Sequence, residues 1–286
     1  MTTYLAALDY QDNWWQILTS AFMRNALVGG TIVALAAGLI GYFVIVRNTV
    51  FAAHALAHIG LPGATGAVLL GLPVALGLGA FCVGGALVIG ALGKRATDRE
   101  VATGTVLAMA TGLGLFFSSL ATRSSSTMTN VLFGNLLAIT HQQIVSFGVL
   151  LALLAACMGI IYRPLLFSSV NAQVAEAKGV PVRGLSIVFM TLLGLSVTMA
   201  VQAVGTLLLF ALIVTPAAVA ITLTAHPALA MGVSAALSVL SVWLGLALSA
   251  MFNAPPSFLV VTITCGVWAV VWASARVASG DRVSTT

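Results

Sequence analysis

The sequence predicts an all-α integral membrane protein, a single transmembrane domain over 1–286 with about nine helices that cross a bilayer. Composition is the first reason: 60% of the residues are hydrophobic and 6% are charged, with a mean hydropathy of +1.14. A soluble domain carries about 25% charged residues. The second reason is that apolar runs of about 20 residues, enough to cross a hydrocarbon core of about 30 Å, recur along the chain. A soluble fold of this length could not bury so much apolar surface.

The expected spans follow one another with short connections. They are placed at 25–46, 50–71, 73–92, 101–121, 143–162, 185–203, 205–224, 227–251 and 256–274. The stretch 185–224 is nearly unbroken and fits either two spans or one span and a re-entrant segment, so eight spans is the alternative. Residues 10–23 mix Trp with polar residues and fit either an interfacial segment or a simple lead-in; with no basic residue leading them, they are not expected to be a secretory signal.

Basic residues orient the helices, because cytoplasmic loops of membrane proteins collect Lys and Arg. With nine spans, the N-terminus outside and the C-terminus inside, only Arg24 and Arg123 fall outside. The other basic residues considered fall inside, including those of a short cytoplasmic tail at 275–286: Arg47, Lys94, Arg95, Arg99, Arg163, Lys178, Arg183, Arg276 and Arg282. This asymmetry also explains the net charge of +5 without a nucleic-acid partner.

Two connections are longer than the others. Residues 122–142 are expected outside and residues 164–184 inside. The internal one contains NAQVAEAKGVPV, whose middle has the composition of a short helix and whose Gly179 and Pro181 are a stop signal. We expect either a docking element for a cytoplasmic partner or a plain connecting loop.

Two histidines lie inside an otherwise uncharged apolar segment, VFAAHALAHIGLPGATG. His54 and His58 are four residues apart, so a helix places them on one face, where they could ligate one transition-metal ion. Hydrogen bonds to neighbouring helices are the alternative use. If the helix begins near Asn48, His58 lies roughly 15 Å deep, about half of the hydrocarbon core. Pro62 and Gly63 are expected to break or kink the helix beside this site and turn free carbonyls toward a cavity.

The remaining chemistry-bearing residues are weaker candidates. His141, at the end of the external loop, is a lesser candidate near the mouth of a path, and His226 is expected to be a solvated turn residue. The three cysteines are isolated in apolar runs, which indicates neither a disulfide framework nor a metal cluster. The chain is not expected to be an enzyme, because it lacks a phosphate-binding loop and cannot hydrolyse ATP itself. No acid is expected in mid-span, which argues against a stand-alone carrier driven by protons; the six are Asp9, Asp12, Asp98, Glu100, Glu176 and Asp281.

Four segments carry a family resemblance when taken in order: AHALAHIGLPG at 53–63, LFGNLL at 132–137, NAQVAEAKGV at 171–180 and VGTLLLFALIVTPAAVA at 204–220. Each segment alone is a motif of low specificity, but together they resemble the membrane-spanning permease subunit of bacterial ABC importers for zinc, manganese or iron. The first is similar to the family motif GDALSHAxLPG. The resemblance extends from about Phe22 to Trp272.

This resemblance implies a homodimeric permease in the inner membrane. It implies cytoplasmic ATPase subunits that dock on the internal loop, with Asn171, Ala175, Glu176 and Gly179 as the matching positions, and a metal-binding protein outside the cell. The metal path would pass His54 and His58, and no cofactor would be bound permanently.

The chain departs from the family pattern at two acids. His54 replaces the usual acid of the first motif, and Asn171 stands where Asp is common. Two neutral imidazoles favour zinc among the available ions, with manganese or iron as alternatives. The same departures would suit a scaffold or regulatory subunit of the same fold that transports nothing.

Overall fold

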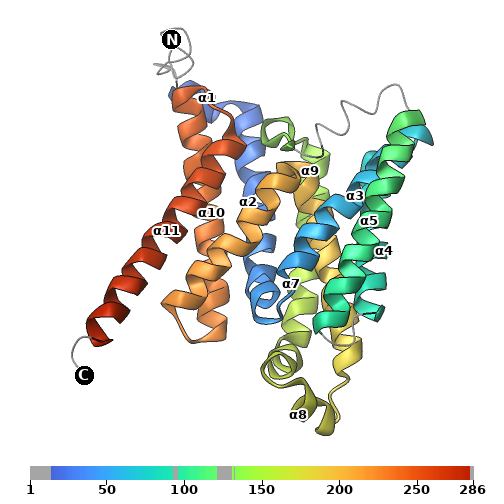
Figure 1. Ribbon diagram of the computed structural model, residues 1–286. Coiled ribbons are helices and arrows are strands. Elements are labelled where there is room, and N and C mark those ends of the chain that lie inside the picture. The colour runs from blue at the N-terminus through green and yellow to red at the C-terminus, as the bar shows by residue number, and fades with distance from the viewer. Residues whose placement is uncertain (1–13, 93–95, 121–130, 132, 284–286) are drawn as a thin grey trace.

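The computed structural model describes residues 14–92, 96–120, 131 and 133–283, and within these residues it is entirely helical (Figure 1). The elements in chain order are α1 (Trp14–Thr19), α2 (Ala21–Val46), α3 (Val50–Leu69), α4 (Val74–Leu92), α5 (Ala96–Leu120), the 3₁₀ turn η2 (Leu136–Ala138), α7 (His141–Val170), α8 (Ala172–Ala177), α9 (Val182–Leu223), α10 (Pro227–Phe252) and α11 (Pro256–Val283). The all-helical membrane fold is confirmed. Of the predicted interfacial segment 10–23, residues 10–13 lie outside the described part, as do 122–130 of the external loop.

Seven described helices are long and apolar enough to cross a membrane by length and composition. They are Ala21–Val46, Val74–Leu92, Arg99–Leu120, His141–Val170, Val182–Thr206, Pro227–Phe252 and Pro256–Arg276. Two other elements of the bundle fall short of that standard. Helix α3 carries two His and one Pro, which lower its hydropathy, and Leu208–Leu223 is a shorter apolar helix. At about 1.5 Å per residue, that helix is roughly 24 Å long, less than a hydrocarbon core of about 30 Å.

Helix α9 is two helices joined at Gly205, whose φ of 77° and ψ of 171° are not helical. The chain rises from α8, turns at this point and descends again toward α10 (Figure 1). Only glycine adopts this backbone region readily. A second glycine, Gly134 (φ 67°), lies so close to Val204 and Gly205 that a Cβ at position 134 would meet their backbone atoms. Glycines of two separate sequence motifs therefore form one tight turn in space.

Helix α3 lies in the middle of the bundle and packs against α4, α5 and α9. On its other side, α2 packs against α9 and α10. Small residues let the backbones approach in both places: a Cβ on Gly63 would meet the Gly77 carbonyl of α4, and one on Gly38 would meet the backbone of Ala235 in α10.

The helix break expected at Pro62 and Gly63 is absent, because α3 continues through both residues to Leu69. Thr65 supports the segment, since its hydroxyl donates to the carbonyls of Leu61 (3.1 Å) and Pro62 (3.2 Å). Proline has no N–H, so the carbonyl four residues earlier, that of His58, has no helical donor. Of the expected break or kink, the break is therefore absent, and the carbonyl that Pro62 leaves without a helical donor belongs to His58.

The predicted internal loop 164–184 is largely helical. Helix α7 runs through Pro164 to Val170, and the predicted short helix is α8. Asn171 caps α8 by accepting a hydrogen bond from the Val174 N–H (3.0 Å), and Gly179 turns the chain with a φ of 82°. At the other end of the chain, α11 continues past its expected end at 274 as far as Val283.

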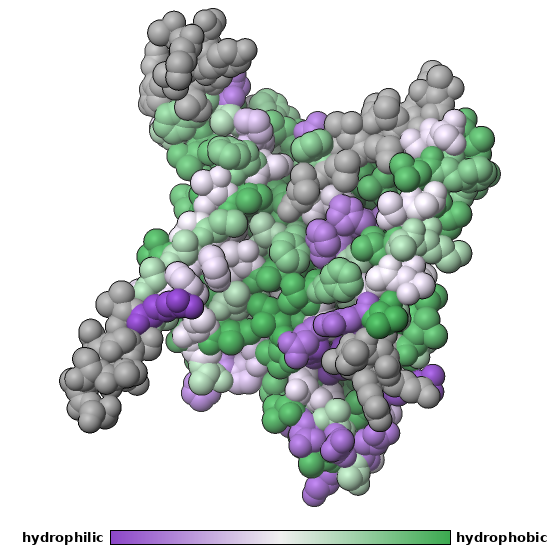
Figure 2. Space-filling view, in the orientation of Figure 1, coloured by the Kyte–Doolittle hydropathy of each residue, from purple (hydrophilic) through white to green (hydrophobic). Residues whose placement is uncertain are grey.

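Apolar residues cover most of the side surface that Figure 2 shows, as expected for lipid-facing helices. Hydrophilic residues gather at the lower end, where α8 lies, and in a central patch on the same face. The central patch is where the candidate site begins.

Candidate functional site

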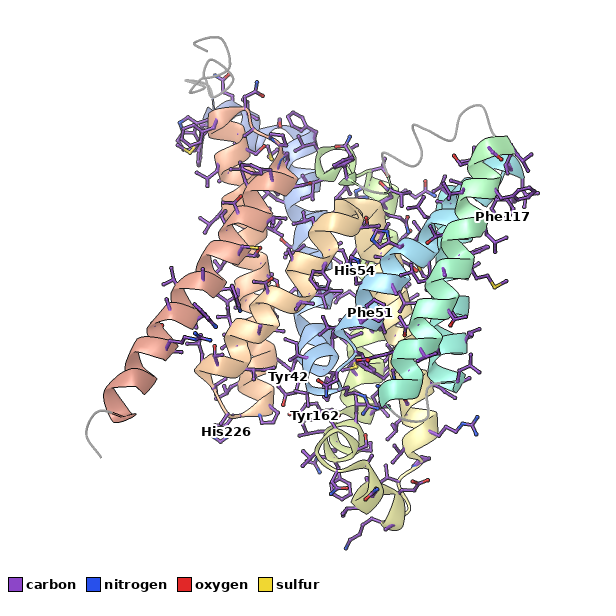
Figure 3. All side chains as sticks on the ribbon, in the orientation of Figure 1. Tyr42, Phe51, His54, Phe117, Tyr162 and His226 are labelled. Atoms are coloured by element: carbon purple, nitrogen blue, oxygen red, sulfur yellow. The ribbon has the colours of Figure 1, made fainter. Side chains whose placement is uncertain are left out.

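His54 and His58 lie on one face of α3, with their ring centroids 4.8 Å apart (Figure 3 labels His54). Both are half-buried, and the same face carries the exposed Phe51. The residues between them, including Ala55 and Leu56, are fully buried by the neighbouring helices. The spacing of four residues therefore does what the sequence predicted: it places both imidazoles on the one face of α3 that its neighbours leave open.

His54 lines an open cavity of about 480 Å³. The other lining residues are Asn48, Val50, Phe51, Glu100 and Phe210. Phe210 comes from the second half of α9 and packs edge-on against His54, with ring centroids 5.3 Å apart. Sequence reasoning missed Phe210 and Glu100 as site residues, because both lie far from the histidines in the sequence and no local pattern links them.

The histidine pair by itself is an incomplete metal site. A structural zinc site uses four ligands, whereas the pair supplies two imidazoles. The described residues contain no group of three or more His, Cys, Asp or Glu side chains that could hold a metal ion. The two imidazole rings pack against each other, and His54 also packs against the Phe210 ring. Incomplete coordination suits an ion that passes through as cargo, because a transported ion must bind well enough to enter and weakly enough to leave.

A second cavity, of about 760 Å³, lies at the end of α2 and is lined by polar residues from five elements or turns. Arg47 and Arg99 line it, together with Gln173 and Glu176 of α8. Asn48 lines both this cavity and the one at His54. The α2–α3 turn therefore lies between the histidine cavity and the cavity that the predicted docking segment lines.

Arg47 holds this turn in place. Its guanidinium donates to the hydroxyls of Ser168 and Ser169 at the end of α7, both at 3.1 Å, and lies 5.5 Å from the centre of the Phe189 ring. Burial, together with the nearby charge of Arg99, lowers the pKa of Arg47 from 12.5 to about 10. At neutral pH both guanidiniums are charged, so this second cavity carries positive charge.

The other predicted site residues are separate from the histidine cavity. His141 is the exposed first residue of α7, and His226 is the exposed residue before α10, at the end of the bundle near α8 (Figure 3). Neither is among the residues that line the cavity at His54. In the predicted docking segment, Ala175 is the buried residue of α8, whereas Glu176 and Gly179 are exposed.

Known proteins resemble this chain over most of its length. The model of the family described as "ABC 3 transport family" matches residues 19–275. A relative from Listeria innocua, "Manganese transport system membrane protein MntC", is 31% identical over 238 residues, which cover 83% of this chain and 85% of the relative. A "Probable iron transport system membrane protein" from Haemophilus influenzae is 27% identical, and the match covers 90% of this chain and 94% of the relative.

Among solved structures, "PsaBC from Streptococcus pneumoniae in complex with Fab" superposes with a TM-score of 0.80 at 27% identity. The match covers 91% of this chain and 94% of that one. The family model spans almost the whole bundle, including α3 and its histidine pair. The chain therefore belongs to the ABC 3 transport family and is a multi-pass bacterial membrane permease.

Proposed function

We propose that the chain is the permease of an ABC importer that carries a divalent transition-metal ion into the cytoplasm past His54 and His58. The observation that carries this proposal is the imidazole pair on the open face of α3, beside a cavity of about 480 Å³. Ionisable side chains within a membrane are costly and commonly mark a transport path. The freed carbonyl of His58 adds an oxygen at the same level.

The cargo is proposed to be manganese, with iron as the alternative. Relatives are named for manganese and, in one case, for iron. Zinc was favoured by the sequence on the softness of two imidazoles alone, and none of these names supports it. Manganese prefers carboxylate and carbonyl oxygens, so its path should offer an oxygen ligand near the histidines.

The proposed topology has nine spans, with α3 and Leu208–Leu223 added to the seven long helices. An odd number is supported by the positions of α1 and the end of α11 at opposite ends of the bundle (Figure 1). With α1 outside, α8 and the end of α11 face the cytoplasm, in keeping with the distribution of Lys and Arg. The protein would then lie in the bacterial inner membrane as one transmembrane domain.

Three partners follow from this topology. A cytoplasmic ATPase would dock on α8, supplying the energy that the chain cannot generate, and an external metal-binding protein would dock at the opposite end. A second copy of the chain would cover the open face of α3. The exposed fractions of Phe51 (45%) and Phe210 (37%) support such a copy, since a polar histidine path between them cannot face hydrocarbon.

Uptake of radioactive manganese and zinc tests the proposal, in cells that lack this protein but retain the ATPase and the binding protein. The wild type and the control His226→Ala, whose histidine lies outside the cavity, should restore manganese uptake. His58→Ala should lower uptake at least tenfold at equal protein level in the membrane. Normal uptake by His58→Ala would remove this residue from the path. No uptake with the wild type would favour the non-transporting scaffold.

A further inference from the structure

The cavity at His54 is lined by a carboxylate that no local sequence pattern links to the histidines. Glu100, in the first turns of α5, lines the cavity together with His54 and Asn48. Among the described residues that form this lining, it is the one acid. The side chain is exposed, so its carboxylate is free to meet an ion in the cavity.

The position of Glu100 is set by the residue before it. The Arg99 guanidinium donates to the Arg47 carbonyl (3.4 Å), which fixes the start of α5 against the α2–α3 turn. The Thr103 hydroxyl donates to the Arg99 carbonyl (2.7 Å) and closes this turn of α5. Along its length α5 packs against α3, the helix that carries the histidines. The carboxylate at position 100 is therefore held at the rim of the cavity by the packing of two helices.

Glu100 cannot be a third ligand to an ion held by both imidazoles, because no group of three such side chains is close enough among the described residues. Its neighbours in the lining, Asn48 and Val50, precede His54 on the way to the α8 end of the bundle. Asn48 lies in the turn before α3, six residues before His54. The carboxylate therefore lies one step beyond the histidine pair on the proposed route inward.

The residues around the cavity indicate a role for the Glu100 carboxylate. Phe51 and Phe210 make the cavity walls partly apolar, which strengthens electrostatic interactions within it. Arg47 and Arg99 line the adjacent cavity beyond Asn48 and place positive charge there, which would repel a divalent cation that leaves His54. A carboxylate offsets that repulsion and supplies the oxygen that manganese prefers. Asn48 can add an amide oxygen from the same lining.

We infer that Glu100 is an oxygen ligand for the transported ion on the cytoplasmic side of His54, where it supplies the negative charge that two neutral imidazoles lack. This inference rests on the proposed function. It makes Glu100 the residue that allows manganese to use a path with two imidazoles. Glu100 and residue 54 should then be interchangeable as the source of the negative charge.

Exchange of the charge between the two positions tests the inference, by measuring manganese and zinc uptake in the same cells with the complete transporter. Glu100→Gln should lower manganese uptake at least tenfold and zinc uptake by less than threefold. Glu100→Asp should keep manganese uptake within threefold of the wild type. In the double variant His54→Asp with Glu100→Gln, manganese uptake should return to within threefold of the wild type. Thr105→Ala, on an exposed part of α5 outside the cavity lining, is the matched control and should transport normally.

Two results would overturn the inference. One is manganese uptake in Glu100→Gln that stays within threefold of the wild type. The other is an equal loss of both metals in Glu100→Gln that His54→Asp fails to correct, which would indicate a structural role. Both require that the wild type transports metal, so they are distinct from a failure of the proposed function, in which the wild type itself would transport neither ion.

Discussion

Gly205→Ala should destabilise the protein by forcing a side chain onto a backbone that only glycine adopts readily. The φ of 77° and ψ of 171° at this residue let the two halves of α9 turn back on each other. Relaxation of the turn is opposed by Gly134, which packs against the backbone of Val204 and Gly205. Strain at residue 205 should therefore stay in the folded state.

The size of the effect follows from the cost of the backbone conformation. A non-glycine residue in such a region costs about 1–3 kcal/mol. At about 1.4 kcal/mol per factor of ten, the ratio of folded to unfolded protein should fall about 5- to 150-fold. Metal uptake should fall as well, because the second half of α9 carries Phe210, whose ring packs on His54.

The assay is thermal unfolding in detergent, beside the matched control Gly232→Ala. Gly232 lies within α10, and a Cβ built there meets no other atom within 4 Å. The control should gain about 0.5–1 kcal/mol, because alanine is the better residue in a helix interior. The unfolding temperature should therefore fall for Gly205→Ala and hold or rise for Gly232→Ala. Equal unfolding temperatures for the two variants would refute the claim that Gly205 is needed for the turn.

Three further substitutions test other contacts of the bundle. Gly63→Val should press on the Gly77 carbonyl and destabilise the α3–α4 contact by about 1–3 kcal/mol, measured as thermal unfolding. The control Gly112→Val should cost less, because a Cβ at that position meets no atom within 4 Å, and equal losses would contradict the packing role of Gly63. Arg47→Ala removes the hydrogen bonds to Ser168 and Ser169 and should cost about 1.5–3 kcal/mol, with faster amide exchange in the α2–α3 turn; unchanged exchange would count against it. Asn171→Ala removes the cap of α8, so it should cost about 0.5–2 kcal/mol of stability and weaken co-purification of the ATPase. Asn171→Asp keeps a hydrogen-bond acceptor and should retain the ATPase. Equal ATPase recovery with Ala and Asp would argue against a role for the cap.

Local patterns in the sequence predicted those features of the structure that depend on a single helix. Long apolar runs indicated most of the spans, and the spacing of His54 and His58 put both on one face of α3. The composition around Ala175 and the glycine after it predicted α8 and its end. These features follow from helix periodicity and capping, which act within a few residues of the chain.

Packing between helices decided the rest. Pro62 was expected to break or kink α3 on local grounds, yet the helix continues to Leu69, and Gly63 lets α4 approach closely at this point. Glu100 and Phe210 reach the histidine cavity only because α5 and the second half of α9 pack beside α3. The sequence by itself determined that this chain is a helical membrane protein with two histidines on one helix face. Only the tertiary structure determined which acid, aromatic ring and glycine turn surround them, because contacts between distant segments depend on shape complementarity across the whole bundle and not on local propensity.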